Sequence, residues 1–270
     1  MASFFEHVRT LVTEQNSMLC VGLDTDNAKL PAHLMDQTGG IIDFNKAIID
    51  ATHDLVCCYK PQIAYYSSQG AEEALIETIQ YAQSKGIPAL LDAKRGDIGN
   101  TAEQYAIELF ERYGADAITV NPYMGTDTLA PYLSYKDKGI FVLCRTSNPG
   151  GADLQNLVLD SGRHVYEHVA HLAHSEWNEH GNVGLVVGAT QPEELATVRK
   201  ITGDMPFLVP GVGAQGGDIE ALMEAAMRQN VIISSSRGVI YASGGEDFAQ
   251  SARSSALETR NSINSARYES

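Results

Sequence analysis

Three charged residues follow one short apolar run, with a spacing that could place them at a single chemical site. The run Ala89-Leu90-Leu91 is followed by Asp92, Lys94 and Asp97. Side chains alternate between the two faces of a strand, so Asp92 and Lys94 are expected on the same face, with Cα atoms roughly 6.5 Å apart. An ammonium held by carboxylates can stabilise negative charge that develops on a substrate and can then donate a proton. The alternative is a solvated ion pair at a strand end, which contributes little.

The residues after this strand predict a turn and then a helix. Gly96 and Gly99 permit a turn that brings Asp97 round, because glycine tolerates backbone conformations that other residues avoid. Gly99 or Asn100 can begin the helix that follows. The apolar strand and the glycine turn favour a chemical site over an isolated surface ion pair.

Eight apolar runs alternate with helical patterns along the chain. The runs are nearly continuous, as in parallel strands that are buried on both faces. The predicted strands are 18–24, 56–61, the run from 89, 117–122, 140–144, 183–188, 207–213 with its loop, and 231–236. The predicted helices are 4–12, 43–54, 71–85, one after 100, one from 126, 163–180, one from 191 and one from 247, whose serine-rich end is expected to fray. This pattern predicts a (β/α)8 TIM barrel, organised as a single domain over 1–270 with a capping helix at the N-terminus.

An open doubly wound sheet is the competing architecture. Such a sheet usually has fewer strands, and its first strand is followed by a G-x-G-x-x-G turn. The turn after Asp24 has no such motif, which favours the barrel.

Polar residues end several of the predicted strands. The C-terminal ends of barrel strands gather at one mouth, where barrel enzymes bind their substrates. Each residue alone could be a solvated loop residue, but together they indicate a site. The residues are Asp24, Lys60, Asp92, Lys94, Ser147, Gln215 and Arg237.

The last two loops have the composition of a phosphate pocket. The loop Gly211–Gly217 offers flexible backbone N–H groups around Gln215, and Arg237 adds a guanidinium at the next strand end. Loops after strands seven and eight of this fold often bind phosphate, and arginine binds it bidentately. The alternative is that the glycines serve only to make turns.

The composition excludes some classes of partner. A net charge of −15 and a pI near 4.8 argue against nucleic acid and anionic membranes, since a phosphate backbone requires a basic surface. The sequence has no apolar stretch of membrane-spanning length and does not begin as a secretory signal does. Four cysteines in apolar runs, without C-x-x-C spacing, are expected to be buried, reduced thiols. We therefore expect a cytoplasmic protein whose partner is a small molecule.

Histidines at positions 164, 168, 171 and 174 have a spacing that places them on one side of a helix. A metal site is one interpretation, but it requires further ligands in a closed geometry. A partly exposed helix face is the favoured interpretation.

The chain resembles the orotidine 5′-phosphate decarboxylase family over nearly its whole length. The most specific match is D-A-K-R-G-D-I-G-N-T at 92–101. No charged position departs from the family pattern. The further matches are Gly22-Leu23-Asp24, Tyr59-Lys60-Pro61, 146–150, 210–217 and Ser236-Arg237-Gly238.

The resemblance implies a role for each matching residue. Lys94 would be the proton donor, and Asp92, Lys60 and Asp97 would complete an array of alternating charges. The resemblance implies no cofactor and no metal. The implied substrate-binding residues are Asp24 for ribose, Ser147 for the pyrimidine edge, Gln215 and Arg237 for the phosphate, and Ile98 and Thr101, which with Asp97 come from the second subunit of a homodimer.

The chemistry of the implied reaction agrees with a fixed ammonium at the site. Loss of CO₂ from C6 of orotate leaves a carbanion that no carbonyl group is placed to delocalise. The site must therefore stabilise localised negative charge and then protonate it. A carboxylate near the carboxylate of the substrate could also destabilise the ground state, which is a contested contribution.

Two alternative functions stay open at this point. A metal-dependent keto-sugar phosphate decarboxylase shares a D-x-K-x-x-D strand, but Mg²⁺ prefers several oxygen ligands and Lys60 would repel a cation. A phosphate-ligand sensor on the same scaffold would bind a nucleotide without turnover, and a fold alone does not separate the two.

Overall fold

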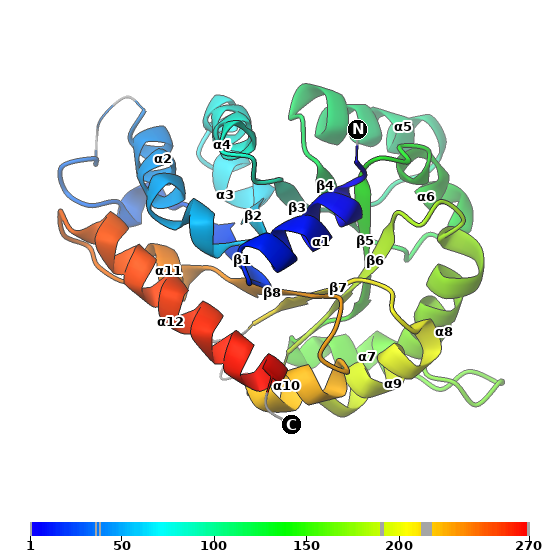
Figure 1. Ribbon diagram of the computed structural model, residues 1–270. Coiled ribbons are helices and arrows are strands. Elements are labelled where there is room, and N and C mark those ends of the chain that lie inside the picture. Colours follow the sequence, from blue (N-terminus) through cyan, green and yellow to red (C-terminus); the bar gives the residue numbers. More distant parts are fainter. Residues whose placement is uncertain (1, 36, 38, 190–191, 212–217, 269–270) are drawn as a thin grey trace.

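The eight predicted strands form one parallel sheet in the computed structural model, which describes residues 2–35, 37, 39–189, 192–211 and 218–268 (Figure 1). They pair in the order β2-β1-β8-β7-β6-β5-β4-β3. The two edge strands, β2 and β3, are joined by isolated bridges from Tyr59 to Ala89 and from Gln62 to Asp92. The sheet is therefore a nearly closed barrel, which confirms the predicted (β/α)8 fold and excludes the open doubly wound sheet. The strands are β1 Leu19–Leu23, β2 Cys58–Pro61, β3 Leu90–Arg95, β4 Ala117–Val120, β5 Gly139–Arg145, β6 Val183–Val187, β7 Phe207–Pro210 and β8 Val231–Ser235.

Helices alternate with the strands and surround them (Figure 1). They are α1 Phe4–Glu14, α2 Gly40–Thr52, α3 Ile63–Ser67, α4 Glu72–Ser84, α5 Gly99–Ile107, α6 Thr126–Leu133, α7 Ala152–Gln155, α8 Val165–Leu172, α9 Pro192–Thr202, α10 Ile219–Ala225, α11 Arg237–Ile240 and α12 Phe248–Tyr268. Short 3₁₀ turns cover Asn27–Lys29, His53–Leu55 and Pro149–Gly151, and π turns cover Glu108–Arg112 and Ala173–Trp177.

Helix α1 packs across the amino end of β5, as expected of a capping helix. Phe4 and Phe5 contact the ring of Phe141 edge to face, with centroids 6.1 and 5.4 Å apart. Gly139 makes this close approach possible, because a Cβ there would lie 2.5 Å from Cδ1 of Phe4. The helix thereby buries its apolar face on the barrel.

The predicted start of the second helix is wrong by three residues. Helix α2 begins at Gly40 and not at 43. Gly39 supplies the left-handed conformation in front of it, with φ 92°. Gly40 then lies so close to Leu34 that a Cβ would come within 2.2 Å of the Leu34 carbonyl oxygen.

The helix predicted over 163–180 is shorter than expected. It begins at Val165, and the helical backbone ends at Trp177. The side-chain oxygen of Asn178 accepts a hydrogen bond from the N–H of Val183 at 2.9 Å, which directs the chain into β6.

The serine-rich C-terminal end, whose fraying stays a prediction, is helical as far as the structure describes it. Helix α12 continues to Tyr268, and Ile263 and Ala266 are buried in its last turns. The amide of Asn264 donates to the carbonyl oxygen of Asn16 at 2.8 Å. These contacts hold the end of the helix against the turn after α1.

All four cysteines are buried and free, as the sequence predicts. No helix in the described ranges is both long and apolar enough to cross a membrane.

Candidate active site

Four charged side chains form a chain of alternating sign at the C-terminal ends of β1, β2 and β3. The ammonium of Lys60 lies 3.9 Å from Oδ1 of Asp24 and 3.2 Å from Oδ2 of Asp92. The ammonium of Lys94 lies 2.6 Å from Oδ1 of Asp92. The predicted shared face of Asp92 and Lys94 is therefore confirmed, and neighbouring strands add the other two charges.

Because these groups are buried, the pKa of each one depends on the charges of its neighbours. The Lys60 side chain is only 6% exposed. Burial alone would lower the pKa of Lys60, but the carboxylates of Asp92 and Asp24 outweigh it and hold that pKa above its ordinary range. Burial would likewise raise the pKa of Asp92, but Lys60 and Lys94 outweigh it and hold that pKa well below its ordinary range. Both groups are consequently charged at neutral pH.

Lys94 differs from Lys60 because it is open to a ligand. Its side chain is 44% exposed, and its backbone adopts the left-handed region with φ 47°. A side chain other than glycine rarely adopts this conformation, which costs of order 1 kcal/mol. Asp92 thus holds the Lys94 ammonium on one side, and the other side of this group is open to the barrel mouth.

Thr119 fixes this corner of the site, although the sequence analysis did not select it. Its hydroxyl donates to Oδ1 of Asp92 at 2.8 Å and accepts from the backbone N–H groups of Ala93 at 3.0 Å and Lys94 at 2.9 Å. The signal in the sequence is one hydroxyl inside the apolar strand 117–120. A threonine is compatible with any strand, so this signal was too weak.

We expect Thr119→Val to lower the free energy of unfolding by about 1–3 kcal/mol, because it leaves buried hydrogen-bonding groups without partners. Turnover should fall as well, because Lys94 loses its backbone anchor. Chemical denaturation and a turnover assay measure the two effects. Thr119→Ser is the matched control, since it keeps the hydroxyl and should keep turnover. Equal losses of turnover in both variants would show that the methyl group and its packing matter instead.

Asp24 has a carboxylate oxygen that lies 3.9 Å from the Lys60 ammonium but accepts no hydrogen bond from the described residues. Its Oδ1 is buried without a hydrogen-bond partner among the described residues. A buried carboxylate oxygen normally has such a partner. The hydroxyl group of a ligand could supply it.

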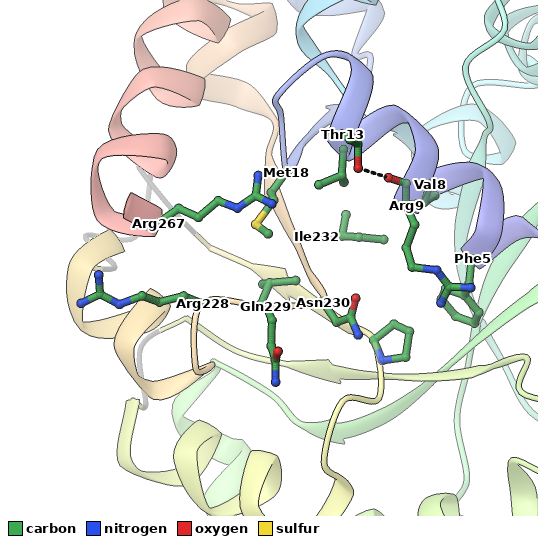
Figure 2. Close-up of a pocket in the computed structure, with 13 residues that line it drawn as sticks. Phe5, Val8, Arg9, Thr13, Met18, Arg228, Gln229, Asn230, Ile232 and Arg267 are labelled. Atoms are coloured by element: carbon green, nitrogen blue, oxygen red, sulfur yellow. Dashed lines mark hydrogen bonds between the residues drawn. The ribbon is translucent and has the colours of Figure 1, made fainter. Parts of the chain in front are cut away.

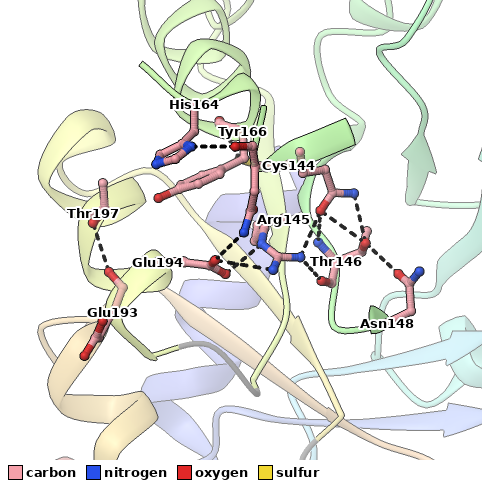
Figure 3. A network of polar contacts seen from close by, with 11 residues as sticks. Cys144, Arg145, Thr146, Asn148, His164, Tyr166, Glu193, Glu194 and Thr197 are labelled. Atoms are coloured by element: carbon pink, nitrogen blue, oxygen red, sulfur yellow. Dashed lines mark hydrogen bonds and ion pairs between the residues drawn. The ribbon is translucent and has the colours of Figure 1, made fainter. Parts of the chain in front are cut away.

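The end of β5 is held by a buried ion pair (Figure 3). The guanidinium of Arg145 lies 2.6 Å from Oε2 of Glu194, on α9. The side-chain oxygen of Gln155, in the loop after Ser147, accepts from the N–H of Thr146 at 2.9 Å. The segment after Ser147, which includes α7, thus folds back onto the strand end that carries Ser147.

Ser147 lies against Gly188, which directly follows the next strand, β6. A Cβ at Gly188 would come within 2.8 Å of both the Cβ and the backbone N of Ser147. Any larger residue at this position would displace the serine. The close packing and the ion pair behind it place Ser147 at the mouth.

The predicted phosphate pocket is described only in part. Ser236 donates to the carbonyl oxygen of Gly22 at 3.2 Å, and Arg237 begins α11 with an exposed side chain. Gly211 adopts φ 101°, which only glycine readily adopts. Gln215 lies outside the described residues, as does most of the loop Gly211–Gly217.

Asp97 follows β3 but forms no ion pair within the described part of the chain. Ile98 and Thr101 lie in the same stretch after the strand. The Asp97 carboxylate accepts only the N–H of Ile98, at 2.8 Å, among the hydrogen bonds described. Ile98 is 60% exposed, and Thr101 is exposed on α5. The turn therefore does not pair Asp97 with the Lys94 of its own chain.

The four histidines form the partly exposed face that the sequence favoured. His168 and His174 are exposed, and His164 and His171 are half-buried. Nδ1–H of His164 donates to the carbonyl oxygen of Asn156 at 2.9 Å, and the backbone N–H of His164 donates to Oε2 of Glu167 at 2.7 Å at the start of α8. Among the described residues, no group of three His, Cys, Asp or Glu side chains is arranged to hold a metal ion.

The fold and the charge chain define the class of this protein, a (β/α)8-barrel enzyme with two lysine ammonium groups paired with carboxylates at the barrel mouth. A family model described as orotidine 5′-phosphate decarboxylase / HUMPS family matches residues 17–252. The chain belongs to this family.

Individual relatives agree with the family match. The orotidine 5′-phosphate decarboxylase of Azoarcus sp. (strain BH72) is 57% identical over 270 residues, which cover 98% of this chain and 99% of the relative. The solved structure of Leishmania donovani OMP decarboxylase matches with a TM-score of 0.84 and 39% identity, over 99% of this chain and 100% of that one. The Leishmania donovani UMP synthase structure matches with a TM-score of 0.86 and 42% identity, over 99% of this chain and 57% of that one.

Proposed function

We propose that the protein decarboxylates orotidine 5′-monophosphate to uridine 5′-monophosphate in pyrimidine biosynthesis. The observation that carries this function is the Lys94 ammonium, held 2.6 Å from Asp92 at the mouth of the barrel. A spectrophotometric assay with orotidine 5′-monophosphate, with and without EDTA, tests it. Turnover that EDTA leaves unchanged is the expected result.

The charge chain supports a metal-independent decarboxylase over the metal-dependent keto-sugar phosphate decarboxylase considered above. The ammonium of Lys60 lies between the carboxylates of Asp24 and Asp92, where a divalent cation would need their oxygens. A cation there would face a buried positive charge. We therefore propose that the reaction uses no metal and no cofactor.

The proposed reaction has two steps. The bond from C6 to the carboxylate breaks, CO₂ leaves, and the electron pair stays on C6. The adjacent Lys94 ammonium stabilises this charge and then transfers a proton to C6. The neutral amine regains its proton from water, while Asp92 and Lys60 keep the local field fixed.

The residues around the charge chain are proposed to bind the rest of the nucleotide. Oδ1 of Asp24, which accepts no hydrogen bond from the described residues, suits a ribose hydroxyl. Ser147, held by the packing at Gly188, suits a pyrimidine edge. Arg237 at the end of β8 suits the phosphate, and Gln215 is proposed to close over it.

We expect Arg237→Ala to lower kcat/KM for the nucleotide by about 2–3 kcal/mol, because it removes charge-assisted hydrogen bonds to the phosphate. The phosphate-free nucleoside should lose almost nothing. Steady-state kinetics with both substrates measure the difference. Arg112→Ala, which removes an exposed arginine before β4, is the control. Equal losses of kcat/KM on the two substrates would show that Arg237 supports the structure of the barrel and does not bind the phosphate.

We also propose a homodimer whose active sites are shared between subunits. The loops after β3 and β4 expose large apolar side chains beside the mouth, with Ile98 60% and Tyr123 81% exposed. Adjacent exposed apolar residues often mark a protein interface. Asp97 lies in the same region without an ionic partner among the described residues. A second subunit would cover this surface and bring Asp97, Ile98 and Thr101 to the neighbouring site.

The organisation and location of the chain complete the proposal. We propose one domain over 1–270, supported by the packing of α1 against β5 and of α12 against α2. The four free cysteines support a reducing compartment, as the cytoplasm provides.

A further inference from the structure

A cavity lies at the end of the barrel opposite to Lys94 (Figure 2). Its volume is about 230 Å³. Pro206 and Asn230, which line it, precede β7 and β8, whereas Lys94 lies at the C-terminal end of β3. Residues of α1 and the end of α12 complete its walls. The cavity is therefore separate from the proposed active site.

The charges around this cavity are all positive. Arg9, Arg228 and Arg267 line it, and no aspartate or glutamate does. This is unusual in a chain with 34 acidic and 19 basic residues. None of the three arginines forms an ion pair with another described residue. Nη1 of Arg267 is buried without a hydrogen-bond partner in the described ranges, and such a group normally has an acceptor.

Two of the arginines face the cavity and one does not (Figure 2). The guanidinium of Arg267 points inward, next to Met18 and near Ile232, and Arg9 lies on the other side beside Phe5. The Arg228 side chain extends away from the cavity. The cavity thus combines an apolar floor with two guanidinium groups on its sides.

One wall of the cavity is a strained turn that a buried arginine holds in place. Met227, Arg228 and Asn230 adopt left-handed conformations, with φ between 48° and 57°. The buried guanidinium of Arg199 donates to the carbonyl oxygen of Gln229 at 3.1 Å. Strained residues persist where the surrounding structure determines them, often at ligand sites. The wall is consequently shaped before any ligand arrives.

We propose that this cavity binds a small organic carboxylate with an apolar body. The planar guanidinium of Arg267 matches a carboxylate through paired hydrogen bonds, and the unpaired Nη1 is one donor for them. The floor of Met18, Val8 and Ile232 takes the apolar body. The volume lies below the 300–1,000 Å³ of sites for drug-sized ligands, so the ligand is smaller than a nucleotide.

Titration calorimetry with benzoate as the probe tests this site. Benzamide has the same shape without the charge, and acetate has the charge without the ring. We expect benzoate to bind at least about tenfold more tightly than either. Arg267→Gln should weaken benzoate by a similar factor and leave turnover unchanged. Arg228→Gln is the matched control and should leave benzoate binding unchanged.

Further variants locate the binding and check folding. Lys94→Ala should bind benzoate as the unchanged protein does, because the proposed site is at the other end of the barrel. Arg267→Lys keeps a positive charge but loses the paired donors of the planar guanidinium, so it should bind benzoate weakly. Circular dichroism checks that each variant is folded. Absence of saturable benzoate binding would overturn the proposal. So would equal binding of benzamide, or binding that Lys94→Ala removes and Arg267→Gln does not.

Discussion

Replacement of Lys94 by alanine is expected to reduce turnover of orotidine 5′-monophosphate by ~10⁴-fold or more while the barrel stays folded. The substitution removes both the charge that stabilises the carbanion and its proton donor. The fold should tolerate it because the side chain is 44% exposed. Asp92 would keep its ion pair with Lys60 at 3.2 Å and its hydrogen bond from Thr119 at 2.8 Å.

Product formation and circular dichroism together measure this prediction. Lys136→Ala is the matched control, because it removes an exposed lysine in the loop before β5. It should keep full turnover. A folded Lys94→Ala protein that still decarboxylates at a substantial rate would refute the assignment of the proton donor.

The second large effect is expected from mixing two inactive variants. Lys94→Ala and Asp97→Ala should each be inactive as homodimers if each site takes Lys94 from one subunit and Asp97 from the other. In a mixed dimer, one site receives both intact residues and the other receives neither. Random exchange of subunits makes half of the dimers mixed, so about a quarter of the full activity should return.

The mixing experiment requires proof that subunits exchange. Differently tagged chains, purified in sequence on both tags, provide that proof and isolate the mixed dimer. A mixed dimer without activity would show that each chain completes its own site. Activity of the Asp97→Ala homodimer close to that of the unchanged protein would remove Asp97 from the catalytic array.

The sequence predicted the barrel because its strands are buried on both faces and appear as continuous apolar runs. It also predicted the pairing of Asp92 with Lys94, since strand periodicity alone places them on one face. To predict that Lys60 lies near Asp24 and Asp92 required only the assumption that strand ends meet at one mouth. These features depend on local periodicity and on one topological rule.

Other features depend on contacts between distant segments and could not be predicted in this way. Thr119 on β4 donates to Asp92 on the neighbouring strand β3, 27 residues away in the sequence. Arg145 reaches Glu194 across 49 residues. The periodicity of a single segment contains no information about such partners.

The isolated bridges between β2 and β3 have a consequence for interpreting variants of the charge chain. Neighbouring strands elsewhere in the sheet share ladders of hydrogen bonds, with register shifts between β3 and β4 and between β5 and β6, whereas among the described residues β2 and β3 are joined by isolated bridges at Tyr59 and Gln62. The ion pair of Lys60 with Asp92 crosses the same seam. It therefore acts as a cross-link between the two edges of the sheet, and local opening of the barrel would begin where it is lost. Substitutions of Lys60 or Asp92 then combine a chemical defect with the loss of a contact across the seam, whereas Lys94 pairs with Asp92 within β3, so its substitution leaves the contact of Lys60 with Asp92 in place.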